Sequence, residues 1–239
     1  MSLTGKLQGR SDVGGKIRIC IVDDHPIVRE GLRKLLDLEP DMVVCAEAEN
    51  YHQAVEKVAA QLPDLIVVDI SLQDRSGIDL IKELRAQDRK MPILVLSVHA
   101  EPTYAERALR AGAQGYVMKD NAPELITRAV RRLMAGEVFV CEQMSARLLS
   151  RLVGREDLAD EGGSVARLTD RELEVLELIA RGEKTGQIAR RLSLSVSTVE
   201  THQAKIKRKL GLAAAPDLIR FAAEWQKSEL GPKSSSRKN

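Results

Sequence analysis

The chain has 239 residues, of which 44% are hydrophobic, 30% charged and 3% aromatic, and its net charge of +2 divides into −4 for residues 1–163 and +6 for residues 164–239. This length suits two domains, and the composition argues against a membrane protein, a secretory signal, and stacking platforms for carbohydrate or single-stranded nucleic acid. We expect a cytoplasmic protein that makes no membrane contact, with a basic second half that binds nucleic acid.

After a leader at residues 1–16, which is expected to be disordered, short apolar runs alternate with amphipathic helical patterns up to residue 135. The runs predict five strands, at residues 17–22, 42–46, 65–69, 93–96 and 115–118. The helical patterns predict five helices, at residues 26–38, 51–61, 78–85, 102–111 and 123–134. Runs such as LIVVD and ILVLS are apolar on both faces, which is typical of a parallel sheet between two layers of helices. We predict an α/β domain with a doubly wound five-stranded parallel sheet at residues 17–135.

The second half of the chain has a different pattern. Residues 136–166 predict a linker that starts as a helix, at 142–153, and continues as a polar, glycine-containing segment at 154–166. Residues 167–228 predict an all-α domain, and residues 229–239 a disordered tail. The four helices of this domain are expected at residues 170–181, 185–192, 196–209 and 214–225.

Polar side chains follow or end most of the predicted strands. Asp23 and Asp24 follow the first strand, Asp69 ends the third, Ser97 follows the fourth and Lys119 follows the fifth. Carboxyl ends of parallel strands meet at one edge of a sheet, so these side chains should converge there. Carboxylates that lie together need a cation such as Mg²⁺, and a carboxylate can itself attack phosphorus to form an acyl phosphate. Lys119 and Ser97 would then bind the phosphoryl oxygens.

Each of these residues also has an ordinary structural interpretation when it is taken alone. The acidic pair could cap the following helix, Lys119 could belong to a solvated turn, and Ser97 could be a loop hydroxyl. Their joint occurrence at strand ends favours metal-assisted phosphoryl transfer. We interpret His25, next to the acidic pair, as a surface or packing residue rather than a ligand.

Residues 17–135 resemble the receiver domain of bacterial two-component response regulators. The segments IVDDHPIVREGL, DLIVVDISLQDRSGIDLIKEL, ILVLSVHAE and ALRAGAQGYVMKD follow the receiver pattern in order and spacing. The resemblance implies a flavodoxin-like fold, with Asp69 as the acceptor of phosphate from a sensor histidine kinase. It implies Mg²⁺ as cofactor, held by Asp23, Asp24, Asp69 and the backbone carbonyl of Ser71.

The resemblance also implies a switch formed by Ser97 and Tyr116, in which the hydroxyl moves towards the phosphate and the aromatic ring turns inward. Two positions depart from or vary within the family pattern. Gln73 stands where receivers usually have proline, which should loosen the loop without removing a catalytic atom. His99 lies where the family tunes dephosphorylation, so the lifetime of the phosphate stays open.

In the second half, Thr169 and Glu172 have the spacing of a capping box, and an apolar stripe follows them. Two short helices joined by a tight turn then suggest a helix-turn-helix, with the helix at 196–209 as the recognition helix. The motifs LTDRE, IARRL and TVETHQAKIKRKLG resemble the LuxR-type helix-turn-helix, and its union with a receiver is typical of the NarL/FixJ subfamily.

This second resemblance implies that the domain binds double-stranded promoter DNA. Base contacts are expected from Glu200, Thr201 and Ala204, none of which is basic, so guanine readout by arginine is not evident. Gln187 stands where the family often has Glu, and Gly186 is an unusual residue within a helix. The DNA-contacting residues are expected to be Thr185, Ser197, Thr198, Glu200, Thr201, Ala204, Lys205, Arg208 and Lys209.

The leading hypothesis is a transcription regulator, not an enzyme, whose phosphorylation either frees the recognition helix or promotes a homodimer through the last helix. An aspartyl-phosphate phosphatase is the enzymatic alternative, but it needs a second acid two residues after the nucleophile, where this chain has Ser71. A regulator that acts through protein contacts without phosphate is a third possibility.

Overall fold

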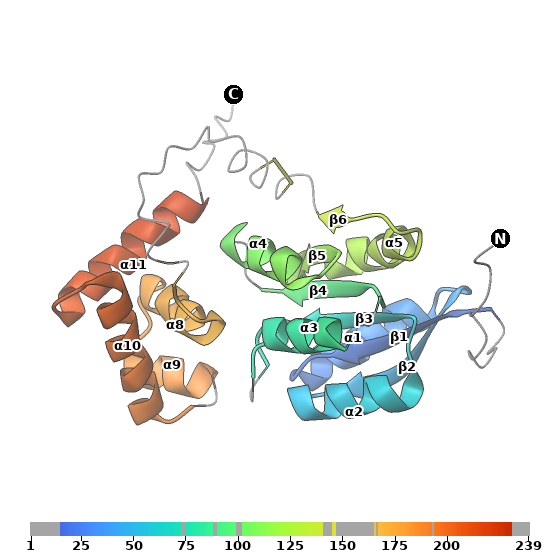
Figure 1. The fold of residues 1–239 in the computed structure, drawn as a ribbon, viewed down its shortest axis with the longest axis horizontal. Helices are drawn as coiled ribbons and strands as arrows, with labels where there is room; N and C mark the ends of the chain where they lie inside the picture. Colours follow the sequence, from blue (N-terminus) through green and yellow to red (C-terminus); the bar gives the residue numbers. More distant parts are fainter. Residues whose placement is uncertain are drawn as a thin grey trace. The chain divides into compact units, whose positions relative to one another are not determined.

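The computed structural model describes residues 15–72, 75–87, 90–98, 102–140, 145–146, 165, 167–192 and 194–230 (Figure 1). The chain divides into two compact units, one of residues 1–98 with 108–141 and the other of residues 99–107 with 142–239. The expectations for the leader up to residue 14, for Gln73, for His99, for most of the helix at 142–153 and for the tail after residue 230 lie outside the described residues.

The first unit is built on a parallel sheet. Its strands are β1 (Ile17–Val22), β2 (Met42–Ala48), β3 (Leu65–Asp69), β4 (Ile93–Ser97), β5 (Gly115–Met118) and β6 (Phe139–Val140), in the spatial order β2-β1-β3-β4-β5-β6. Every pair of neighbouring strands is parallel. The predicted α/β fold is therefore confirmed, and the reversal of strand order between β1 and β3 creates the switch point at which ligands bind in such sheets.

The sheet has six strands where the sequence predicted five. The additional β6 covers only two residues, and Phe139 pairs in register with Gly115 of β5. Two residues are too few to give a recognisable apolar run, although Phe139 is buried. The strand β2 is also two residues longer than predicted, because it alternates buried and half-buried residues as an edge strand does.

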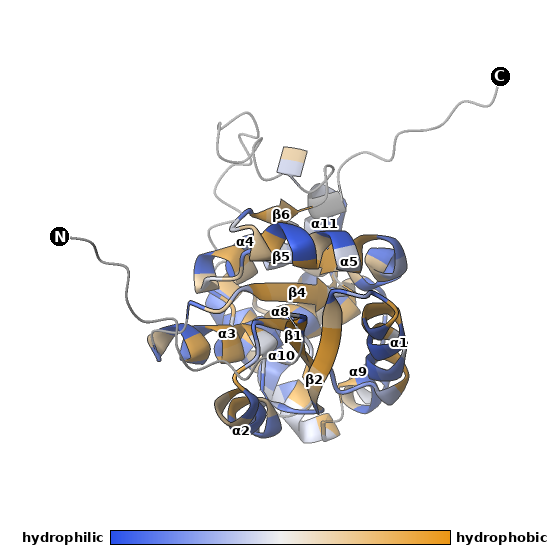
Figure 2. Cartoon of the chain, turned by 90° about the vertical axis from the view of Figure 1, so that its right-hand side faces the viewer, coloured by the Kyte–Doolittle hydropathy of each residue, from blue (hydrophilic) through white to orange (hydrophobic). Residues whose placement is uncertain are grey.

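Helices cover both faces of the sheet. They are α1 (Pro26–Asp37), α2 (Tyr51–Gln61), α3 (Gly77–Ala86) and α5 (Ala122–Met134), with a short 3₁₀ helix, η1 (Lys119–Asn121), before α5. The helix α4 (Pro102–Ala111) begins in the second unit and ends in the first. α1 packs against α5 on one face, and α2 packs against α3 on the other (Figure 1). The strands between them are mostly hydrophobic (Figure 2). Burial of side chains such as Ile19, Ile21 and Leu36 stabilises the unit by about 2 kcal/mol each.

The second unit contains the helices α8 (Asp170–Ala180), α9 (Thr185–Arg191), α10 (Val196–Leu210) and α11 (Ala215–Leu230). α8 contacts the other three helices. The predicted capping box is present: the Thr169 hydroxyl accepts from the Glu172 amide, and a Glu172 carboxylate oxygen accepts from the Thr169 amide. α11 continues five residues past its predicted end at Trp225, because no helix-breaking residue occurs before Gly231 and Pro232.

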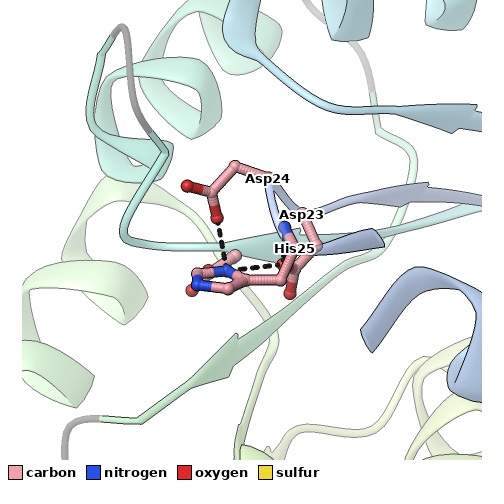
Figure 3. A group of neighbouring side chains, drawn as sticks. Asp23, Asp24 and His25 are labelled. Atoms are coloured by element: carbon pink, nitrogen blue, oxygen red, sulfur yellow. Dashed lines mark hydrogen bonds and ion pairs between the residues drawn. The ribbon is translucent and has the colours of Figure 1, made fainter. Parts of the chain in front are cut away.

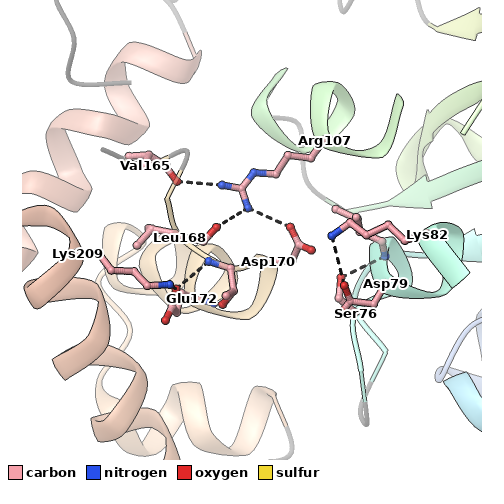
Figure 4. A network of polar contacts seen from close by, with 11 residues as sticks. Ser76, Asp79, Lys82, Arg107, Val165, Leu168, Asp170, Glu172 and Lys209 are labelled. Atoms are coloured by element: carbon pink, nitrogen blue, oxygen red, sulfur yellow. Dashed lines mark hydrogen bonds and ion pairs between the residues drawn. The ribbon is translucent and has the colours of Figure 1, made fainter. Parts of the chain in front are cut away.

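Arg107 of α4 is grouped with the second unit, where it binds the segment that leads into α8 (Figure 4). Its guanidinium donates to the carbonyls of Val165, at 2.9 Å, and Leu168, at 3.0 Å, and pairs with the Asp170 carboxylate at 3.0 Å. These bonds satisfy backbone carbonyls that lie ahead of the first turn of α8. Among the described helices, none is long and apolar enough to cross a membrane.

Candidate functional site

The register of the sheet brings the strand-end side chains to one edge. Asp69 is the last residue of β3 and pairs with Leu96, so Ser97 lies one position further along β4. Val22 pairs with Val68, which places Asp23 beside Asp69. Lys119 directly follows Met118, the partner of Ser97. The predicted convergence is therefore found, at the switch point between β1 and β3.

Lys119 links the two most buried carboxylates of this edge. Its Nζ lies 2.6 Å from Oδ2 of Asp23 and 2.7 Å from Oδ2 of Asp69. Both carboxylates are at most 2% exposed. Burial, together with the negative charge of Asp23, raises the pKa of Asp69 to about 6, although Lys119 acts in the opposite direction. Burial alone would lower the pKa of Lys119, but the two carboxylates outweigh it and raise that pKa above its ordinary value.

Hydrogen bonds at both ends of the loop between β3 and α3 hold the backbone next to Asp69. The Ser71 amide donates to Oδ1 of Asp69 at 3.2 Å, and the Gly77 amide donates to the carbonyl of Ile70 at 2.7 Å. Gly77 opens α3, and a Cβ atom there would lie 2.0 Å from the Asp69 carbonyl oxygen. Only glycine allows this close approach, so Gly77 fixes the position of the Asp69 backbone. Gly77 was not among the residues predicted from the sequence, although its place beside the cap residue Ser76 was a usable signal.

His25 lies closer to the acidic group than its sequence position led us to expect. Its Nδ1 is 2.6 Å from Oδ1 of Asp24 and 3.3 Å from Oδ1 of Asp23, and its amide donates to Asp23 Oδ1 at 2.8 Å (Figure 3). The side chain is 64% exposed, as a surface residue would be, but its Nδ1 edge faces the carboxylates. Its adjacency to the acidic pair was the only signal for this in the sequence.

The residues at this edge fit a divalent cation. Asp23, Asp24, His25 and Asp69 each offer one ligand atom, and these atoms lie within 4.8 Å of one another. Oδ2 of Asp23 and Oδ1 of Asp24 are buried, and within the described part of the chain they receive no hydrogen bond of normal geometry, only the charged contacts with Lys119 and His25. Buried carboxylate oxygens of this kind need positive charge, and hard oxygen donors are what Mg²⁺ prefers.

Ser97 and Tyr116 occupy adjacent strands. Ser97 ends β4 and is fully buried, and Tyr116 in β5 is 1% exposed. Both side chains are therefore buried within the first unit.

The helix α10, which the sequence predicted as the recognition helix, presents a polar surface. Its N-cap is Ser195, whose hydroxyl accepts from the Thr198 amide at 3.0 Å. Val199 and Ile206 are buried and fix the inner face. The five positions predicted to face outward are exposed, and so are Val196 and Ser197 in the first turn; the five are Glu200, Thr201, Ala204, Lys205 and Arg208.

Several other expected DNA-contacting side chains already have partners within the domain. The Nζ of Lys209 lies 2.5 Å from Oε2 of Glu172 (Figure 4). Burial alone would raise the pKa of Glu172, but Lys209 and the Thr169 amide lower it. A contact between Lys209 and a DNA phosphate would therefore have to replace this ion pair.

The hydroxyl groups near the start of α10 are bound locally as well. The Thr201 hydroxyl donates to the Ser197 carbonyl at 2.9 Å, and those of Ser197 and Thr198 each lie 2.8 Å from the Ser195 hydroxyl. Thr185 of α9 accepts from Gln203 at 3.4 Å. These hydrogen bonds orient the hydroxyl groups before DNA or another ligand binds.

Comparison with known proteins gives matches to both units. A family model described as the response regulator receiver domain matches residues 19–131, and one described as bacterial regulatory proteins of the luxR family matches residues 166–222. The nitrate/nitrite response regulator protein NarL of Escherichia coli K12 is 34% identical over 211 residues, covering 88% of this chain and 95% of NarL.

Two further matches cover most of the chain. The oxygen regulatory protein NreC of Staphylococcus aureus MRSA252 is 34% identical over 209 residues, covering 86% of this chain and 96% of NreC. Among solved structures, RcsB from Salmonella enterica serovar Typhimurium, bound to a promoter with the phosphomimetic BeF3⁻, is 27% identical with a TM-score of 0.58. That match covers 87% of this chain and 99% of the RcsB chain.

Proposed function

The chain belongs to the NarL/FixJ subfamily of two-component response regulators, and from this membership we propose that Asp69 accepts a phosphoryl group from a sensor histidine kinase. Members of this family are phosphorylation-dependent, DNA-binding transcription regulators rather than enzymes. The observation that carries the assignment of Asp69 is its buried carboxylate, held beside Asp23 by the ammonium group of Lys119.

In the proposed transfer, an Oδ atom of Asp69 attacks the phosphorus atom of a phosphohistidine. The new P–O bond forms as the P–N bond breaks, and the histidine nitrogen keeps the electron pair of the broken bond. The ammonium group of Lys119 then exchanges its contact with the Asp69 carboxylate for a contact with a phosphoryl oxygen. Ser97 donates a hydrogen bond to another phosphoryl oxygen.

Asp23, Asp24, Asp69 and the carbonyl of Ser71 would hold Mg²⁺ in this site. When bound, the metal supplies positive charge that lets carboxylates and phosphoryl oxygens lie together. This role is supported by the two buried carboxylate oxygens that have no normal hydrogen bond among the described residues.

The effect on DNA is proposed to be a population shift. Phosphate stabilises one arrangement of Ser97 and Tyr116, and this arrangement raises DNA affinity by freeing α10 or by promoting a homodimer through α11. The exposed side chains of α10 contact DNA: Glu200, Thr201 and Ala204 at the bases, with Lys205 and Arg208 at the phosphates. Thr185, Ser197, Thr198 and Lys209 are proposed as further backbone contacts.

Incubation with acetyl phosphate and Mg²⁺ tests the acceptor. We expect the wild-type protein to gain one phosphoryl group, seen by intact mass spectrometry, and Asp69→Asn to gain none. Asp79→Asn is the matched control, because Asp79 is a partly exposed carboxylate at the start of α3 that should not affect the reaction. Equal phosphorylation of wild type and Asp69→Asn would refute the assignment.

Two alternative functions predict different results in further assays. Sustained hydrolysis of small phosphomonoesters would favour a phosphatase, against which the absence of an acid at Ser71 argues. If Asp69→Ala leaves DNA binding and promoter output unchanged under phosphorylating conditions, the protein acts independently of phosphate.

A further inference from the structure

The acidic edge of the sheet carries a nitrogen donor in addition to its carboxylates. The Nδ1 atom of His25 is 2.6 Å from Asp24 Oδ1 and 3.3 Å from Asp23 Oδ1. Two ligands on opposite sides of one first-row metal ion lie about 4.2 Å apart, because each bond is about 2.1 Å long. Ligands at a right angle on such an ion lie about 3.0 Å apart. The ligand atoms of Asp23, Asp24, His25 and Asp69 lie within 4.8 Å of one another, so they share one ion once Nδ1 of His25 gives up its 2.6 Å contact with Asp24 Oδ1 and the two atoms move apart.

The local backbone holds the His25 ring in this place. His25 is the N-cap of α1 and precedes Pro26, which favours the extended backbone observed at φ −92° and ψ 111°. Its amide donates to Asp23 Oδ1 at 2.8 Å, so the same carboxylate that faces the ring also fixes its main chain. This preorganisation lowers the entropy cost of using the ring as a ligand.

The remaining donors indicate where the ion would sit. Asp23 is 1% exposed, and its Oδ2 receives no normal hydrogen bond among the described residues, only the charge of Lys119 at 2.6 Å. Oδ1 of Asp24 is likewise buried and contacts only the His25 ring among the residues that the structure describes. Figure 3 shows the side chains of Asp23, Asp24 and His25 gathered at the loop that joins β1 to α1.

From this geometry we propose that His25 is a direct metal ligand and that the site binds divalent first-row transition ions, such as Co²⁺ or Mn²⁺, through one nitrogen and several carboxylate oxygens. Imidazole suits transition ions, whereas Mg²⁺ gains little from it. His25 would thus set the metal preference of the acceptor site. The inference rests on the proposed function, since the metal site is the one beside Asp69.

Binding measurements on the full chain test the selectivity. We expect titration calorimetry to show that His25→Asn and His25→Ala lower Co²⁺ affinity by about 10-fold or more, the scale on which disturbed metal sites lose affinity. Mg²⁺ affinity should change by less than about 2-fold, because Mg²⁺ depends on the oxygen ligands. His52→Asn is the matched control, since His52 is exposed on α2. Circular dichroism establishes that each variant is folded.

Pulsed electron paramagnetic resonance of the Mn²⁺-loaded protein tests the bond itself. We expect the ¹⁴N coupling of a directly bound imidazole in the wild type and in His52→Asn, and its loss in His25→Ala. Absence of that coupling in the wild type, its persistence in His25→Ala, or equal Co²⁺ affinity in wild type and both His25 variants would overturn the proposal.

Phosphorylation by acetyl phosphate with Mg²⁺ separates this proposal from the proposed function. If the wild type shows the nitrogen coupling but is not phosphorylated at Asp69, His25 stands as a metal ligand and the assignment of Asp69 as phosphoacceptor is wrong. If the wild type is phosphorylated at Asp69 but shows no nitrogen coupling, the phosphoacceptor assignment stands and the proposal that His25 is a metal ligand is wrong.

Discussion

At the scale of single residues, Lys119 compensates the charge of the Asp23 and Asp69 carboxylates. It is 10% exposed and contacts two carboxylates that are almost fully buried. Two buried carboxylates without a cation would repel each other and lose hydration, so one of them would have to take up a proton. Lys119 therefore stabilises the charged site before phosphate arrives, and Mg²⁺ can share that role.

This leads to a prediction for Lys119→Met. Removing one partner of a buried ion pair should lower the free energy of unfolding by about 3 kcal/mol without Mg²⁺. Addition of Mg²⁺ should stabilise the variant more than the wild type, because the metal replaces the lost charge and no longer competes with an ammonium group. Urea unfolding followed by far-ultraviolet circular dichroism, with and without Mg²⁺, measures both effects. Lys82→Met, at an exposed lysine of α3, is the control; equal Mg²⁺ increments in Lys119→Met and wild type would contradict this role of Lys119.

The sequence predicted some of these residues and not others for a physical reason. Asp69 and Lys119 end or follow buried strands, and the rule that parallel strand ends meet at one edge needs no side-chain detail. The position of His25 depends on a ring orientation set by the turn before α1, and the pairing of Lys209 with Glu172 depends on how α10 packs on α8. Neither contact leaves a periodic signal in the sequence.

At the scale of elements, the start of α3 fixes the backbone of Asp69, the proposed acceptor. Gly77 lies against the Asp69 carbonyl and donates its amide to the Ile70 carbonyl at 2.7 Å. The helix therefore begins against the end of β3, with Ser76 as its cap. A side chain at Gly77 would push the two backbones apart, which would displace the Asp69 carboxylate from Lys119.

Gly77→Ala should accordingly slow phosphorylation by acetyl phosphate. A displacement of about 1 Å at a reacting group can cost about 100-fold in rate, so a loss of about 10-fold or more is expected. Gly31→Ala provides the matched control, because a methyl group at Gly31 in α1 would meet no atom within 4 Å, and alanine favours a helix. Time courses of phosphoryl incorporation, read by intact mass spectrometry, measure both variants. Equal rates for Gly77→Ala and Gly31→Ala would show that the contact does not position Asp69.

The elements themselves were predicted well where long periodic patterns exist. All five longer strands and the helices around them follow apolar runs or stripes that any such sheet requires. β6 was missed because Phe139–Val140 pairs with β5 through only two residues, and its position depends on the preceding turn. α11 was predicted too short because its last turn has polar residues, which continue a helix without marking one.

At the scale of the whole molecule, the negative charge that phosphorylation adds opposes the gain in DNA affinity that phosphorylation is proposed to cause. Residues 1–163 carry a net charge of −4 and residues 164–239 a net charge of +6. Phosphorylation replaces the single negative charge of the Asp69 carboxylate with a phosphate group that carries about −1.5 to −2 charges at neutral pH. The acidic part therefore becomes more negative by about one half to one charge, which by itself would weaken attraction to DNA. Any gain in affinity on phosphorylation must therefore come from exposing α10 or from joining two copies of the domain.

These two routes predict different salt dependence. If phosphorylation joins two domains on one DNA, the number of phosphate contacts rises, and the slope of log K against log salt concentration should become about twice as steep, at roughly −0.9 per contact on duplex DNA. If it only frees α10, affinity rises while the slope per bound chain stays nearly unchanged. Fluorescence anisotropy with a labelled promoter fragment, at several salt concentrations and with or without acetyl phosphate, measures the slopes. Asp69→Asn should show one slope under both conditions, and a slope that changes equally in that variant would attribute the effect to acetyl phosphate itself rather than to the acceptor residue.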